Sequence, residues 1–155
     1  MIIFGERING MYRDVRTAIT ERDKTVIQDL VRAQLAGGAD VMDLNVGPAK
    51  GDALESFVWL AQTVREVTDK PLSLDSAKAD LLGQVVPRVR QAVPDTKLVI
   101  NSCTAAPDYM AKLVPLAAKH GTGIIGLTMD QRGVPGNAEQ RVECGAAFMM
   151  GAMEA

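Results

Sequence analysis

The 155-residue chain contains 47% hydrophobic and 23% charged residues, which is the composition of a folded globular protein and not of a disordered one. Its net charge of −2 gives no basic surface for nucleic acid, and no run of about 18 apolar residues is present to cross a membrane. The N-terminal residues do not form a signal peptide, and the two cysteines, Cys103 and Cys144, lack the spacing of metal ligands. We therefore expect a cytoplasmic protein with free thiols and no metal site.

The first half of the chain alternates short apolar runs with helical patterns. Residues 2–5 and 40–45 are predicted to be buried strands. Between them, apolar residues at helical spacing follow Asp23, a favoured N-cap residue, and stop at Gly37. Asp52 predicts the start of the next helix in the same way.

The second half continues this alternation. Three further strands are expected, at residues 72–75, 97–101 and 123–128. The helix after the first of them is predicted to span 77–86, because Pro87 has no N–H and disfavours continuation. Pro107 predicts the first residue of the next helix. A last helix is expected near the C-terminus, with one apolar face formed by Val142, Ala146 and Met149.

Five strand–helix units in series predict an α/β fold with a parallel sheet and right-handed crossovers. A complete (β/α)8 barrel needs eight units and about 250 residues. The chain is therefore either an open α/β sheet or the first part of a barrel. In the second case its first and last strands are both unpaired edges, so we expect the chain to associate into a homo-oligomer.

Polar side chains end three of the predicted strands. Asp43 and Asn45 share one face of the second strand, and Asp75 ends the third strand opposite its leucines. Asn101 ends the fourth strand, and Asn9 lies in the loop after the first. Parallel strands bring their carboxyl ends to one edge, where barrel enzymes have their active sites, so these residues predict one polar cup. Carboxylates accept hydrogen bonds and carboxamides both donate and accept, which suits a flat heterocycle with amino and lactam edges.

No motif for nucleophilic or nucleotide-dependent chemistry competes with this cup. Gly5 and Gly10 do not form a G-x-G-x-x-G loop, and no nucleophile elbow, H-E-x-x-H or P-loop is present. Each Asp or Asn could instead cap a helix or hydrogen-bond within a loop, as these residues commonly do. That alternative accounts less well for Asp75 and Asn101, because both end apolar strands.

Several short segments, in order along nearly the whole chain, resemble the methyltetrahydrofolate:corrinoid protein methyltransferases. This group is related to the folate domain of cobalamin-dependent methionine synthase and, more distantly, to dihydropteroate synthase. The segments are residues 5–10 (GERING), 42–48 (MDLNVGP), 74–76 (LDS), 100–102 (INS) and 125–129 (IGLTM). The resemblance implies a (β/α)8 TIM barrel of which the chain holds the first five βα units. Residues 1–155 would then be an N-terminal fragment, a pterin-binding barrel domain that is incomplete at its C-terminus.

The same resemblance implies an activity and a site. The family moves a methyl group from N5 of methyltetrahydrofolate to cob(I)alamin carried by a separate corrinoid protein, or the reverse, in one-carbon metabolism. Asp75 and Asn101 would hydrogen-bond the edge of the pterin, and Asp43, Asn45 and Asn9 would line the same cup. The family's asparagine that acts near N5 lies beyond this chain, so the catalytic residues stay unknown.

Three other functions remain open. The nearest is a condensing enzyme like dihydropteroate synthase, although residues 6–10 lack the Ser-rich, Asn-Thr-Pro-type stretch of that enzyme. A non-catalytic folate- or corrinoid-binding barrel fits an incomplete chain, and the third is an unrelated sugar- or acid-processing barrel enzyme. A titration with methyltetrahydrofolate, beside a sugar phosphate, distinguishes these functions.

Overall fold

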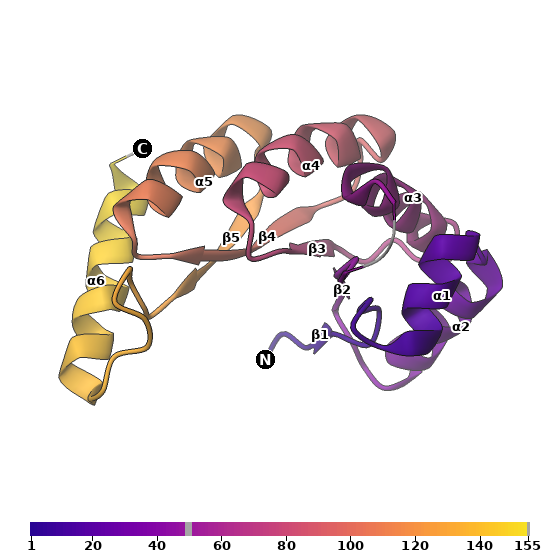
Figure 1. Cartoon of the computed structure of the whole chain (residues 1–155), viewed down its shortest axis with the longest axis horizontal. Coiled ribbons are helices and arrows are strands. Elements are labelled where there is room, and N and C mark those ends of the chain that lie inside the picture. The colour runs from indigo at the N-terminus through magenta and orange to yellow at the C-terminus, as the bar shows by residue number, and fades with distance from the viewer. Residues whose placement is uncertain (49–50, 155) are drawn as a thin grey trace.

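The computed structural model describes residues 1–48 and 51–154 and contains a parallel five-stranded sheet. The strands are β1 (Phe4–Gly5), β2 (Val41–Leu44), β3 (Leu72–Asp75), β4 (Leu98–Thr104) and β5 (Gly123–Leu127). They lie in the order β1-β2-β3-β4-β5, and each neighbouring pair is parallel (Figure 1). This sequential order confirms the predicted α/β fold of successive βα units. It differs from a doubly wound sheet, in which the strand order reverses.

Helices cover one side of this sheet. In the described residues they are α1 (Arg13–Glu21), α2 (Lys24–Ala36), α3 (Ala53–Arg65), α4 (Ala79–Ala92), α5 (Pro107–His120) and α6 (Ala138–Met153). Figure 1 shows α3, α4 and α5 along one side of the strands, with α1 and α2 at the β1 end and α6 at the β5 end. The opposite side of the central strands is thereby left uncovered by the described helices.

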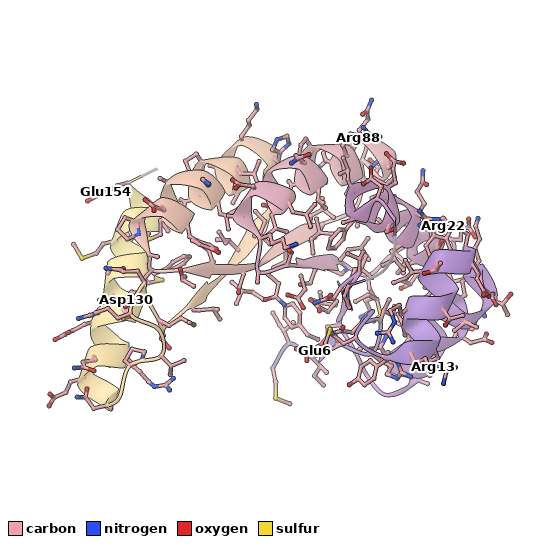
Figure 2. The ribbon with its side chains drawn as sticks, in the orientation of Figure 1. Glu6, Arg13, Arg22, Arg88, Asp130 and Glu154 are labelled. Carbon is pink, nitrogen blue, oxygen red and sulfur yellow. The ribbon has the colours of Figure 1, made fainter. Side chains whose placement is uncertain are left out.

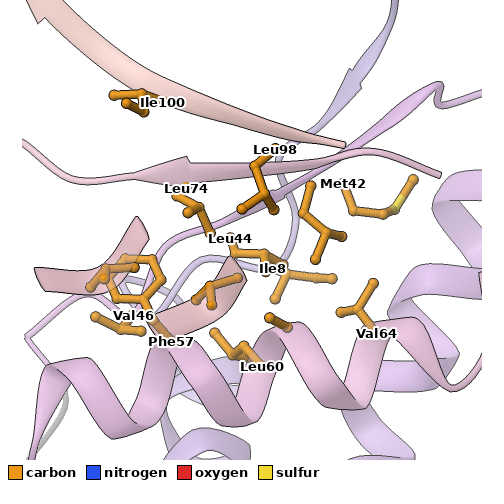
Figure 3. Packing of buried hydrophobic residues seen from close by; sticks show 14 of the residues in the cluster. Ile8, Met42, Leu44, Val46, Phe57, Leu60, Val64, Leu74, Leu98 and Ile100 are labelled. Atoms are coloured by element: carbon orange, nitrogen blue, oxygen red, sulfur yellow. The ribbon is translucent and has the colours of Figure 1, made fainter. Parts of the chain in front are cut away.

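The helix-facing side of the sheet forms the hydrophobic core. Fully buried side chains of β2, β3, β4 and α3 meet there, among them Leu44, Leu74, Ile100, Phe57 and Leu60 (Figure 3). Leu72 of β3 is fully buried in the same cluster. Because side chains alternate along a strand, burial of the two β3 leucines places Ser73 and Asp75 on the other face. A shift of one residue in the register would exchange the two faces, so the core leucines determine which side is polar.

The predicted helix ends are largely confirmed. Asp23 and Asp52 cap α2 and α3, and each side chain accepts hydrogen bonds from two backbone N–H groups of the first turn. Pro107 is the first residue of α5, and Gly121 ends that helix in the left-handed conformation, with φ of 58°.

One helix, α1, is absent from the sequence prediction. Its buried residues Val15, Ala18 and Ile19 are at helical spacing, so the periodic signal is present. Tyr12 at the N-cap makes no capping hydrogen bond, and Arg22 takes the left-handed conformation that glycine usually supplies at the other end. Without the usual residues at either end, the sequence gives no boundary signal.

The prediction that Pro87 ends or kinks its helix near residue 86 is wrong about the end, since α4 continues to Ala92. A proline inside a helix costs about 3 kcal/mol, because it removes one hydrogen bond and crowds the preceding turn. Val85, Val86 and Val89 on either side of it are fully buried. Their packing in the core holds the helix together through the proline.

The last helix packs against the sheet with a different face from the predicted one. Val142 and Met149 share one side of α6, but they are 71% and 62% exposed. The buried residues of α6 are Cys144 and Phe148. The ring of Phe148 lies so close to β5 that a Cβ at Gly126 would be 2.3 Å from it. The absence of a side chain at Gly126 therefore allows α6 to approach the sheet.

Both cysteines are free, as predicted, and both are buried. Burial raises the pKa of the Cys103 thiol to about 11, so it is a packed thiol rather than a nucleophile. No helix in residues 1–48 and 51–154 combines the length and apolar character needed to cross a membrane. In the same part of the chain, no three His, Cys, Asp or Glu side chains are arranged to hold a metal ion.

Candidate functional site

The polar residues predicted on β2, β3 and β4 come together on the side of the sheet that faces away from the core. Asp43 of β2 lies opposite Ser73 of β3, and Asp75 of β3 lies opposite Asn101 of β4. Asn45 follows directly after β2. The strands are parallel and in order, so these side chains lie together near one edge of the sheet. The prediction that Asn101 ends its strand is wrong, since β4 continues to Thr104. We call Asp43, Asn45, Asp75 and Asn101 the polar cup.

Two hydrogen bonds between side chains organise the polar cup. The Nδ2 of Asn45 donates to Oδ2 of Asp75 at 2.7 Å. The Nδ2 of Asn101 donates to Oδ1 of Asp43 at 3.1 Å, which joins β2 to β4 across the strand between them. Each pair therefore couples a carboxylate on one strand to a carboxamide on another.

Asn9 lies next to the cup, but its side chain is used in its own loop. Its backbone pairs with that of Asn45, which places the β1–α1 loop beside the β2–α3 loop. Its Oδ1 accepts a hydrogen bond from the N–H of Met11 at 2.9 Å. The two loops approach so closely that a Cβ on Gly10 would be 2.2 Å from the carbonyl oxygen of Val46. Asn9 therefore lies beside the cup with its side-chain oxygen already bonded in its own loop, and its role in lining the cup stays a prediction.

Asp43 is the most buried member of the cup, with 2% of its surface exposed. Burial raises the pKa of its carboxyl group, and the nearby charges of Asp75 and Glu6 raise it further. Figure 2 shows Glu6 on the side of β2 and β3 opposite to the helices α3 and α4. Ser73 and the amide of Asn101 lower the pKa of Asp43, because they favour its ionised carboxylate. The cup thus holds several carboxylates close together in a partly desolvated environment.

Ser73 is a component of the site that the sequence prediction did not include. Ser73 is a fully buried residue of β3 and is paired with Asp43 of β2. Its hydroxyl faces Asp43 without a hydrogen bond of regular geometry. The alternation that places Asp75 on this face places Ser73 there too, so the position was predictable. The small side chain of Ser73 lies between Asp43 and Asn101, and its effect on their contact depends on the geometry of the three strands.

Two oxygens of the polar cup are free to accept hydrogen bonds from a ligand. The pairing with Asn45 occupies Oδ2 of Asp75 and leaves Oδ1 without a partner among the described residues. The pairing with Asp43 uses the Nδ2 of Asn101, and the Oδ1 of Asn101 also has no partner among the described residues. Such an arrangement can bind an edge that carries N–H donors, and none of these side chains is an activated nucleophile.

The chain is similar to proteins of known activity. Residues 13–152 match the pattern of the family described as pterin binding enzyme. The methylcorrinoid:tetrahydrofolate methyltransferase of Eubacterium limosum is 33% identical over 145 residues, which cover 92% of this chain and 52% of that protein. The methionine synthases of Mycobacterium leprae and Mycobacterium tuberculosis are 27% and 24% identical, over 92% of this chain and 12% of their own lengths.

The chain thus spans about half of the length of the first of these relatives and a small part of the other two. The matched range includes the positions of the polar cup, whereas Asn9 lies outside it. Because the pattern covers residues 13–152, which is most of the chain, the chain belongs to the family of pterin-binding enzymes.

Proposed function

We propose that this chain is part of a methyltransferase that moves a methyl group between N5 of tetrahydrofolate and the cobalamin of a corrinoid protein. The observation that carries the proposal is the 33% identity, over 92% of the chain, to the methylcorrinoid:tetrahydrofolate methyltransferase of Eubacterium limosum. The polar cup supports it, because an acceptor-rich face suits the amino-pyrimidine edge of a folate.

Asp75 and Asn101 are the proposed pterin-binding residues. The unoccupied Oδ1 of Asp75 would accept N–H groups from the pyrimidine ring and its amino group. The Oδ1 of Asn101, one strand along, would accept a further N–H group of the same edge. Asp43 and Asn45 hold these two groups in place from β2.

The chemistry requires binding and orientation more than a protein nucleophile. Transfer from N5 breaks the bond between the methyl carbon and N5, and the electron pair stays on N5, which gains a proton. The methyl carbon forms its new bond to the cobalamin of the partner protein, which is a substrate of the reaction. The chain's part is to hold the pterin by one edge and leave N5 accessible, which lowers the entropic barrier to the reaction.

The test is a methyl-transfer assay on the natural protein that contains this chain. Tetrahydrofolate and methylcobalamin are mixed with the protein, and the cobalamin spectrum and the formation of methyltetrahydrofolate are followed together. We expect both signals to change at the same rate, and only in the presence of protein. Binding of methyltetrahydrofolate without any transfer would refute the proposed activity, and preferential binding of a sugar phosphate would refute pterin recognition as well.

A non-catalytic folate-binding protein is the second candidate. The observation in its favour is that the chain spans only 52% of the Eubacterium limosum relative. Titration of the 155-residue chain itself with methyltetrahydrofolate, followed by the same transfer assay, separates the two functions.

A further inference from the structure

We infer that Asp43 is a positioning residue, which holds the carboxamide of Asn101 so that its oxygen, and not its nitrogen, faces the ligand. Asn45 donates to Oδ2 of Asp75 and so leaves Oδ1 of Asp75 as the oxygen that can accept from the ligand. The identity of the ligand as a pterin rests on the proposed function, whereas the orientation of the two side chains does not.

The geometry of three neighbouring strands makes this arrangement possible. Asp43 and Asn101 are 58 residues apart and lie on β2 and β4, which are not neighbours in the sheet. Their side chains meet over β3, where the residue paired with Asp43 is Ser73. Because Ser73 is small and fully buried, it leaves room for the 3.1 Å contact between Asn101 Nδ2 and Asp43 Oδ1.

The chemistry of the groups determines their orientation. An ionised carboxylate can only accept hydrogen bonds, so the carboxamide of Asn101 must turn its N–H group toward Asp43. The Oδ1 of Asn101 then points away from Asp43. For Asn45 the orientation is fixed at both ends, since its Oδ1 accepts from the N–H of Gly47 at 2.7 Å while its Nδ2 donates to Asp75.

Protonation of Asp43 would release this constraint. The titratable groups that face Asp43 are Asp75 on β3 and Glu6 after β1, and both are acidic. They act together with burial to raise the pKa of Asp43, while Ser73 and Asn101 lower it. A protonated Asp43 can donate a hydrogen bond, so Asn101 could then turn its oxygen toward Asp43 and its nitrogen toward the ligand.

The two free oxygens, Oδ1 of Asp75 and Oδ1 of Asn101, favour a specific class of ligand edge. Two acceptors from adjacent strands match a ring N–H beside an exocyclic amine, as in an aminopyrimidinone. A site built to accept from such an amine discriminates strongly against an analogue that lacks it, because the acceptor is then left unpaired. We therefore expect a 2-desamino-2-methyl analogue of methyltetrahydrofolate to bind at least tenfold more weakly than methyltetrahydrofolate itself.

The first test needs no ligand. In the natural protein that contains this chain, the side-chain amide resonance of Asn101 is followed by NMR as the pH is lowered, beside the carboxyl carbons of Asp43 and Asp75. We expect the Asn101 signal to move with the titration of Asp43 in the wild type and to lose that transition in Asp43→Asn. An Asn101 signal that titrates unchanged in the variant, or that never responds to Asp43, would overturn the inference.

The second test uses methyltetrahydrofolate binding by the natural protein that contains this chain. Asp43→Ala removes the acceptor, so we expect affinity to fall about tenfold. Asp43→Asn keeps an oxygen that can accept from Asn101, so it should recover most of the affinity. Its affinity should no longer change with the pH at which Asp43 is protonated in the wild type. Wild-type affinity in a folded Asp43→Ala variant would contradict positioning by Asp43. If Asp43→Ala does not fold, the pH profile of Asp43→Asn decides, because an unchanged profile would also contradict it.

The two proposals can fail separately. If the wild type does not bind methyltetrahydrofolate, the proposed function is wrong, while the NMR titration still determines whether Asp43 orients Asn101. If the wild type binds but the Asn101 signal is independent of Asp43, the proposed function stands and the positioning inference fails.

Discussion

Replacing Asp75 with asparagine should weaken methyltetrahydrofolate binding by one to two orders of magnitude. In the wild type, Oδ2 of Asp75 accepts from Asn45, whose own oxygen is held by the N–H of Gly47. Asn45 therefore cannot turn over, and an asparagine at position 75 must direct its oxygen toward Asn45 and its N–H group toward the ligand. The variant loses a charge-assisted hydrogen bond, which is worth about 1.5–3 kcal/mol, and places a donor against the donors of the pterin.

The measurement is isothermal titration of the natural protein that contains this chain, with folding checked by circular dichroism. Asp23→Asn is a matched control, because it makes the same chemical change at the N-cap of α2, where asparagine caps as well as aspartate. The control should bind like the wild type. If Asp75→Asn also stays within about twofold of the wild type, a difference near 0.4 kcal/mol, then Asp75 does not contact the ligand and the site is misplaced.

Four further outcomes are expected. Gly126→Ala should destabilise the fold by about 1–3 kcal/mol in thermal unfolding, because its Cβ would be 2.3 Å from the Phe148 ring, whereas Gly123→Ala, 3.4 Å from its nearest neighbour, should cost less. Asp43, whose pKa in the fold is raised above its ordinary 3.8, stabilises the protein most below that value and loses this contribution as the pH rises through the raised pKa. The stability of Asp43→Asn, measured by denaturant unfolding, should therefore improve relative to the wild type as the pH increases; a constant difference would contradict the raised pKa. Cys103, with a pKa of about 11, should resist alkylation near neutral pH in the folded chain and react after unfolding in urea. The isolated chain, in which β1 and β5 each pair on one side only, should self-associate in light scattering, and a monodisperse monomer would contradict this.

Strands β2 to β5 were predictable because their apolar residues form short runs with turn residues on either side. The prediction of a buried first strand over residues 2–5 is wrong about its start, since β1 is Phe4–Gly5 and Ile2 and Ile3 are exposed. The three central strands carry both the core and the cup, and alternation alone assigns Leu74 to one face and Asp75 to the other. The elements that could not be predicted depend on contacts distant in sequence. The continuation of α4 through Pro87 depends on packing of its valines in the core, which outweighs the local preference of proline.

The same distinction applies to the site. The sequence indicates that Asp43, Asn45, Asp75 and Asn101 lie near one another, because each is predicted at or near the carboxyl end of a parallel strand. It does not indicate that Asn101 reaches past its neighbour on β3 to Asp43, since that contact depends on sheet twist and on the small size of Ser73.

The acceptor character of the cup has an energetic consequence for the whole fold. Asp43 and Asp75 are brought together with Glu6 by the same strand order that forms the core, and their proximity disfavours the ionised state of Asp43. The leucines on the opposite face of β3 and the helices that cover them provide the burial that offsets this unfavourable term. A ligand that supplies N–H donors would satisfy the free oxygens and stabilise the folded chain in proportion to its binding. The free oxygens that can bind a ligand therefore lie on the same face as the closely spaced acidic groups that disfavour ionisation of Asp43.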